Sequence, residues 1–152
     1  MMLHRIGITV AALAMTILTT SSPGAQQHTD MCGVWSGTYL AVSPSRENEP
    51  GPRFNKAELV VDIKEQSENA FWGVSRWRVV GRDGWNSSEV TGSISLIDPA
   101  AVSIVEKSSN LQTGVVGLID GTLKDGKLYI DFRGFRAGTA YSTVLERSQT
   151  RP

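Results

Sequence analysis

The sequence feature that most constrains the fold is an alternation of apolar and polar residues that recurs along the chain after residue 25. In one run, Leu59, Val61 and Ile63 share one face while charged residues dominate the other, and residues 90–96 alternate in the same way. A period of two is typical of half-buried β-strands, and no helical periodicity longer than two turns interrupts it. The sequence therefore predicts an all-β protein.

Alternating runs of this kind predict about eight strands. Asp125 and Gly126 lie between two of them and are typical of a type I′ hairpin turn, which makes those strands antiparallel. A small sheet of this kind closes most economically into a single up-and-down β-barrel, because closure removes the exposed edges. A β-sandwich is the competing architecture. The predicted strands cover residues 34–42, 58–64, 71–80, 90–96, 102–105, 115–123, 128–132 and 140–145.

Residues 41–56 contain Pro44, Pro50 and Pro52 among charged residues. Proline cannot donate a hydrogen bond to a sheet ladder, so this segment cannot continue a central strand. It predicts a long first connection over one mouth of the barrel. The barrel domain is expected to span residues 33–148, with short tails at 26–32 and 149–152.

The first 25 residues have the three-part layout of a secretory signal peptide. Arg5 supplies a positive charge, residues 6–18 are uncharged and mostly apolar, and residues 19–25 are small. The apolar run is shorter than the roughly 20 residues that a membrane-spanning helix needs. We expect cleavage after residues 1–25 and a secreted or periplasmic mature protein with no membrane association; an uncleaved anchor is the alternative.

Composition excludes several classes of function. The chain has 15 Lys and Arg against 15 Asp and Glu, and this balance argues against nucleic acid or a membrane surface as a partner. Cys32 is the only cysteine, so it is either a small buried hydrophobe or a thiol available outside the chain. His28, in the predicted tail, is the only histidine after the signal, which argues against catalytic triads and zinc sites. We expect no metal and no cofactor.

Gly33-Val34-Trp35 opens the first predicted strand, and Arg147 closes the last. This pattern resembles the Gly-x-Trp signature of lipocalin-type (calycin) barrels. The resemblance implies that Trp35 packs beneath Arg147 and closes one end of the barrel. Such a stack of an indole on a guanidinium contributes about 0.5 to 2 kcal/mol.

The same opening also resembles avidin-like barrels, which begin with Gly-Thr-Trp and hold biotin. Where that family offers an Asn and a Ser to its ligand, this chain reads Ser36-Gly37-Thr38-Tyr39, so a biotin site is not expected. Three further segments are similar to poorly characterised, exported bacterial proteins of the lipocalin-like type. That similarity implies the fold and no function; it covers residues 59–66, 71–73 and 121–123.

The strand at residues 71–80 is unusually rich in aromatic residues. Alternation places Phe71 and Trp77 on one face and Trp72, Arg76 and Arg78 on the other. Because unpaired buried arginines are costly, we predict that Phe71 and Trp77 face the lumen. The opposite register would put two arginines inside the barrel and create an anion site.

Glu106 shares the alternation of Val102 and Ile104, so it is the one acid whose burial has to be checked, and the sequence leaves its burial open. If its carboxyl were buried, its pKa would be raised and it could bind or exchange a proton. Most other acidic side chains are expected on the solvated face. Trp85 lies in a glycine-bearing turn. It is either an exposed contact residue or folded back over the rim of the barrel.

Three functions are compatible with these features. The leading hypothesis is a binding protein that holds a small, mainly apolar ligand in its lumen, because eight-stranded barrels have room for one such ligand. The alternatives are a protein-interaction module or inhibitor of an extracytoplasmic enzyme, acting through the Pro-rich loop and Trp85, and a cofactor-free cyclase or isomerase using Glu106 and a tyrosine. The candidate ligand-binding residues are Tyr39, Phe71, Trp77, Phe132 and Tyr141.

Overall fold

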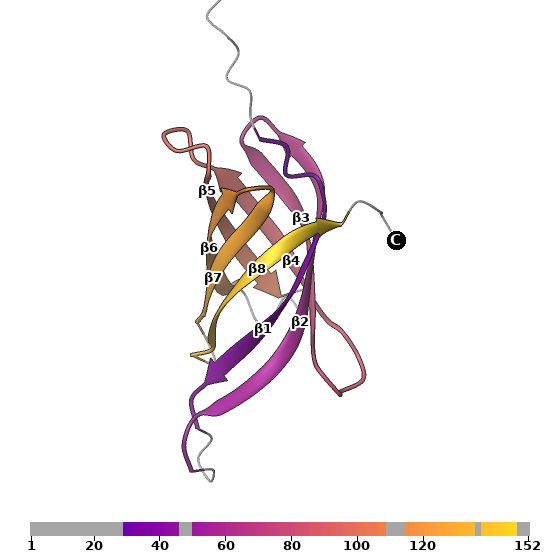
Figure 1. The fold of residues 1–152 in the computed structure, drawn as a ribbon, viewed down its shortest axis with the longest axis vertical. Coiled ribbons are helices and arrows are strands. Elements are labelled where there is room, and N and C mark those ends of the chain that lie inside the picture. Colours follow the sequence, from indigo (N-terminus) through magenta and orange to yellow (C-terminus); the bar gives the residue numbers. More distant parts are fainter. Residues whose placement is uncertain (1–28, 46–49, 109–114, 136–137, 149–152) are drawn as a thin grey trace, which may run out of the picture.

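The structure is a computed structural model that describes residues 29–45, 50–108, 115–135 and 138–148. These residues form a closed barrel of eight antiparallel strands in which each strand pairs with the next and the last returns to the first (Figure 1). The predicted signal peptide (1–25), His28 and residues 149–152 lie outside the described residues. The strands are β1 (Gly33–Ser43), β2 (Arg53–Ser67), β3 (Ala70–Val79), β4 (Asn86–Ile94), β5 (Ala101–Ser108), β6 (Val115–Lys124), β7 (Lys127–Gly134) and β8 (Ala140–Ser148).

This topology confirms the predicted up-and-down barrel and excludes the sandwich. The hairpin between β6 and β7 turns at Asp125 and Gly126, whose φ angles of 53° and 73° are those that a type I′ turn requires. In the part of the chain that the structure describes, no helix is long and apolar enough to cross a membrane.

The prediction of a loop over residues 41–56 is wrong at both ends. β1 continues to Ser43 and β2 begins at Arg53, and these two residues pair directly. The prolines do not prevent this, because Pro44 and Pro52 lie just beyond the paired residues, where no ladder hydrogen bond is lost. The first hairpin is therefore longer than its proline content suggested.

The inward face of β3 is the predicted one. Phe71 and Ser75 are buried, at 4% and 1% exposure, whereas Trp72 is 47% exposed. Trp77 is partly buried and packs against the core. Arg78 forms an ion pair with Glu58 of β2 at 2.8 Å on the outer wall. The alternative anion site, with arginines in the lumen, is therefore excluded.

One end of the barrel is closed by Trp35. Its ring is buried, and its Nε1 donates a hydrogen bond to the Met31 carbonyl oxygen at 2.9 Å. The Arg147 guanidinium lies 5.6 Å from the centre of the Trp35 ring and donates to Asp30 at 2.7 Å. Trp35 therefore lies beneath Arg147, as the Gly-x-Trp resemblance implied.

The described residues just before β1 are part of this closure. Met31 is fully buried, and its N–H donates to Oε1 of Gln66 at 2.7 Å. Cys32 is half-buried and packs against the core. Gly33 has a φ of 126°, and a Cβ there would lie 3.2 Å from the Arg147 side chain, so the motif needs glycine at this position.

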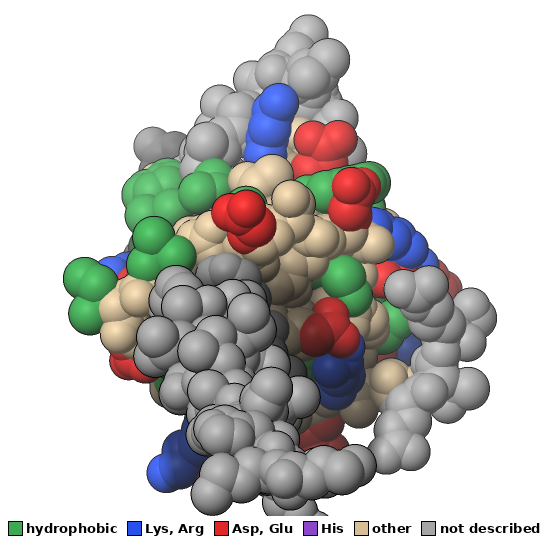
Figure 2. All heavy atoms as spheres, turned by 90° about the horizontal axis from the view of Figure 1, so that it is seen from above, with side chains coloured by type: hydrophobic (Ala, Val, Ile, Leu, Met, Phe, Trp, Pro, Cys, Tyr) green, Lys and Arg blue, Asp and Glu red, His purple; other side chains and the backbone are tan. Residues whose placement is uncertain are grey.

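The surface of the closed end carries acidic, basic and hydrophobic side chains without separation into single-sign faces (Figure 2). Figure 2 views the molecule from this end. The mixture agrees with the balanced composition of the chain.

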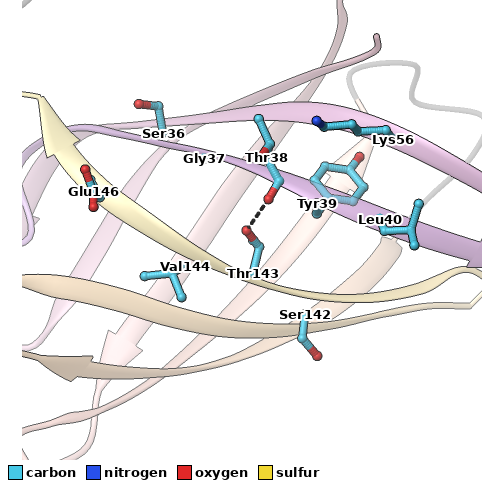
Figure 3. Close-up of a pocket in the computed structure, with 10 residues that line it drawn as sticks. All are labelled: Ser36, Gly37, Thr38, Tyr39, Leu40, Lys56, Ser142, Thr143, Val144 and Glu146. Carbon is cyan, nitrogen blue, oxygen red and sulfur yellow. Dashed lines mark hydrogen bonds between the residues drawn. The ribbon is translucent and has the colours of Figure 1, made fainter.

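The ladder between β1 and β8, the seam of the barrel, is interrupted along part of its length. Residues 34–36 pair with 146–148, and Val42 pairs with Ala140, but residues 37–41 do not pair with β8. The Thr143 hydroxyl instead donates to the Thr38 carbonyl at 2.7 Å (Figure 3). A shallow groove on the outer face follows this interruption.

Replacing Trp35 with alanine is expected to lower the free energy of unfolding by about 3 to 5 kcal/mol, because it leaves a cavity and removes the cap on the closed end. The matched control is Trp72→Ala on the outer wall, which should cost less than about 1 kcal/mol. Urea denaturation of both variants measures the difference. Equal losses would show that Trp35 does not have this structural role.

Backbone amides at the β1–β8 seam are expected to exchange with solvent faster than those of the fully paired β2–β3 ladder, because residues 37–41 lack ladder bonds to β8. Hydrogen–deuterium exchange followed by peptide mass spectrometry measures this. The comparison is between peptides covering residues 37–41 and 57–63. Protection that is equal in the two peptides would contradict the interrupted seam.

Candidate functional site

A cavity of about 290 Å³ lies in the half of the barrel opposite Trp35. Its walls come from the last residues of β1 and β3, the first of β2 and β8, and the facing parts of β5, β6 and β7. Residues 44–45, 50–52 and 80–85 lie at the same end of the barrel. The aromatic lining residues are Tyr39, Trp77, Phe132 and Tyr141, and the polar ones are Ser43, Asn55, Glu106 and Thr139.

Four of the five predicted ligand-binding residues therefore line one cavity. The fifth, Phe71, does not: it is buried in the closed half of the barrel and packs over Gly92, which has no side chain to obstruct the ring. Alternation identified the inward face of β3 correctly, but it does not show how deep along the barrel an inward residue lies.

Three aromatic rings form a stacked wall on one side of the cavity. The centroids of the Tyr39 and Tyr141 rings are 3.8 Å apart, and those of Phe132 and Tyr141 are 4.7 Å apart. The rings come from β1, β8 and β7, which are neighbours in the barrel. Phe132 fits because Gly117 faces it, where a Cβ would lie 2.5 Å from the ring. The three rings therefore stack on one another and form a continuous aromatic wall across three neighbouring strands.

Glu106 lies in this cavity and is 3% exposed, which answers the question that the sequence left open about its burial. Its Oε1 atom has no hydrogen-bond partner among the described residues. Burial raises the pKa of Glu106 above its ordinary value of 4.5, and the nearby hydroxyl groups of Ser75 and Ser88 lower it in part. The Ser75 contact is a weak one, since its Oγ forms no hydrogen bond of normal geometry.

The charge of Glu106 contributes to the raised pKa values of both tyrosines in the wall. Burial raises the pKa of Tyr39 to about 12, and the negative charge of Glu106 adds to the shift. Burial raises the pKa of Tyr141 further, with the charges of Glu106 and Tyr39 acting in the same direction. Both phenols therefore remain protonated at neutral pH and available as hydrogen-bond donors.

No described residue that lines the cavity is a lysine or an arginine. The charge of Glu106 consequently has no counterion within the lining. Within the described ranges, no group of three or more His, Cys, Asp or Glu residues is arranged to hold a metal ion.

Sequence reasoning missed the polar rim of the cavity. Asn55 and Ser43 fell within the segment expected to be a loop, and Thr139 was assigned to a connection. The Ser43 and Thr139 hydroxyls are 2.9 Å apart and join the end of β1 to the residue before β8. Asn55 precedes Ala57 by two residues and therefore shares the alternation of Ala57 and Leu59. Continuing this alternation into the segment expected to be a loop would have predicted that Asn55 faces the lumen.

Two other surface features are less suited to binding a small molecule. Trp85 is 43% exposed, but the Arg78 guanidinium lies 4.7 Å from the centre of its ring, so the ring lies back against β3. The groove along the β1–β8 seam is open to solvent and is lined mainly by exposed residues such as Ser36, Thr38 and Glu146 (Figure 3).

No family model, curated protein or solved structure matches this chain. The barrel is compatible with the calycin-like type of small barrel.

Replacing Glu106 with glutamine is expected to raise the free energy of unfolding relative to wild type, by an amount that grows as the pH rises above 4.5. The folded protein holds the Glu106 proton more tightly than the unfolded chain does, so wild type loses stability between 4.5 and the raised pKa. The difference in the free energy of unfolding between Glu106→Gln and wild type should grow with pH, up to about 1.4 kcal/mol for each unit by which the pKa is raised. Above the raised pKa, this difference should stay constant.

Urea denaturation between pH 4 and pH 8 measures this difference. Glu89→Gln, at an exposed position on the neighbouring strand β4, provides the baseline for removing one surface carboxylate. A difference between Glu106→Gln and wild type that matches this baseline at every pH would contradict the raised pKa.

Proposed function

We propose that this protein is an exported, lipocalin-like binding protein whose barrel holds one small, mainly apolar ligand. The cavity of about 290 Å³ carries the proposal, because ligand sites are typically concave and mostly apolar, with a few polar groups. The pattern of residues 1–25 supports export. The contact between Trp35 and Arg147 supports the lipocalin-like relationship.

The contrast between the two halves of the barrel favours a ligand site over a packing defect. In the closed half, Ile63 and Leu145 are completely buried, so the chain fills that part of the lumen with its own side chains. In the open half, alanines at positions 41 and 57 line the cavity. An unfilled apolar space costs stability, because the lining atoms lose contacts. A ligand that fills it restores them.

The arrangement of aromatic residues favours a flat ligand. Trp77 is on β3 and Phe132 is on β7, four strands apart and therefore on opposite sides of the barrel. A ring bound between them would contact aromatic surface on both faces, and such contacts add to the energy of burial. Ser43, Asn55 and Thr139 offer hydrogen bonds at the mouth.

A second candidate function is cofactor-free proton transfer on a bound molecule, as in a cyclase or isomerase. The buried carboxyl of Glu106 beside Tyr39 and Tyr141 favours it, since a raised carboxyl pKa is typical of general acids and bases. A binding protein releases its ligand unchanged and an enzyme does not. Because an isomer has the same mass as its parent, incubation of the protein with the extracted ligand, followed by chromatography and NMR that resolve isomers, separates the two.

Binding is expected to be visible at the indole N–H of Trp77. Titration with 3-phenyl-1-propanol should shift this signal in a ¹H–¹⁵N correlation spectrum, because Trp77 lines the cavity. The signals of Trp35, at the closed end, and Trp72, on the outer wall, should stay in place. Ala41→Phe should fill the cavity and weaken binding by at least about tenfold.

The matched control is Leu40→Phe, which adds a ring at the next residue of β1 on its exposed face. It should leave the affinity within about twofold of wild type. Equal losses in both variants, or shifts at Trp72 in place of Trp77, would refute binding in the cavity. Native mass spectrometry of protein purified from its own host then identifies the natural ligand.

A further inference from the structure

We infer that the ligand carries a positively charged amine that pairs with the Glu106 carboxylate while its apolar part packs on the ring wall formed by Tyr39, Tyr141 and Phe132. This inference rests on the proposed function and names the chemical class of the ligand.

The first observation is the unmet hydrogen-bonding capacity of Glu106. Its side chain is 3% exposed and lines the cavity, and its Oε1 has no partner among the described residues. Buried polar atoms are nearly always paired, and a buried unpaired carboxylate is especially costly. An unpaired oxygen facing a cavity marks the point where a ligand would donate a hydrogen bond.

The second observation is the charge of the cavity. Glu106 is its acidic residue, and none of the described lining residues is a lysine or an arginine. A bound ammonium group would supply the missing counterion. A bound carboxylate would instead face Glu106 in a region of low dielectric constant, where two like charges repel strongly.

The third observation is the position of the carboxylate relative to the aromatic wall. Glu106, Tyr39 and Tyr141 line the same cavity, and the charge of Glu106 raises the pKa of both phenols. An ammonium group beside Glu106 would therefore also lie near phenol oxygens that can accept its hydrogen bonds. The apolar part of the ligand would then pack on the ring wall.

The inference has a defined pH dependence. The amine pairs with ionised Glu106, so its affinity should rise with pH through the raised pKa of Glu106 in the free protein. The titratable groups facing Glu106 are Tyr39 and Tyr141, whose raised pKa values keep them neutral over this range. Ser75 and Ser88 also face it and do not titrate.

Three probes with one carbon skeleton test the inference: 3-phenylpropylamine, 3-phenyl-1-propanol and 3-phenylpropionate. Isothermal titration calorimetry of the whole protein at pH 7.5 should show the amine binding at least about tenfold more tightly than the alcohol. The carboxylate should bind more weakly than the alcohol. Glu106→Gln should reduce the affinity for the amine to that for the alcohol, and Glu89→Gln should leave both affinities unchanged.

The outcomes separate the inference from the proposed function. If the alcohol or the carboxylate binds as tightly as the amine, the inference is overturned and the binding function stands. If no probe binds, both are overturned. Wild-type titrations between pH 5 and pH 8 need no variant: an amine affinity that rises with pH, beside a constant alcohol affinity, supports the inference, and parallel curves refute it.

Discussion

The closure of one end of the barrel by Trp35 is the constraint on which the rest of the structure depends. The indole N–H donates a hydrogen bond to the Met31 carbonyl, and the Arg147 guanidinium lies over the indole ring. Gly33 leaves room for this guanidinium. These contacts join the segment before β1 to the end of β8, so the first and last strands meet there even though their ladder is interrupted farther along. The cavity lies in the half of the barrel opposite this closure.

The candidate site combines a well-packed aromatic wall with a buried carboxylate whose ionised form is destabilised. The stacked rings of Tyr39, Tyr141 and Phe132 are held by neighbouring strands, and Phe132 packs against glycine. Glu106 has the opposite character, because its burial without a counterion in the cavity lining raises the free energy of its ionised form. A group that destabilises the fold in this way is typical of a functional site.

Much of the site could be predicted from alternation, and the errors have definite physical causes. Parity along β3 placed Trp77 inside the barrel, and parity along β5 singled out Glu106 as the acid to check for burial, because successive side chains in a strand point to opposite faces. It could not place Phe71 in the closed half, since depth along the barrel depends on the stagger between strands. The prolines near residues 41–56 concealed the ends of β1 and β2, and with them the inward positions of Ser43 and Asn55.

The sequence by itself determined that this chain is an all-β protein of about eight strands with at least one antiparallel hairpin, because alternation and turn chemistry are local properties. The closure at Trp35 was implied by a resemblance, and the choice between barrel and sandwich needed the strand pairing of the whole chain. Only the tertiary structure decided that the other half contains a cavity, that three rings from β1, β7 and β8 stack along it, and that Glu106 has no partner there. Those features depend on which side chains meet across the lumen. Residues that meet there are far apart in the sequence, so their contacts and the empty volume between them exist only once the barrel has closed.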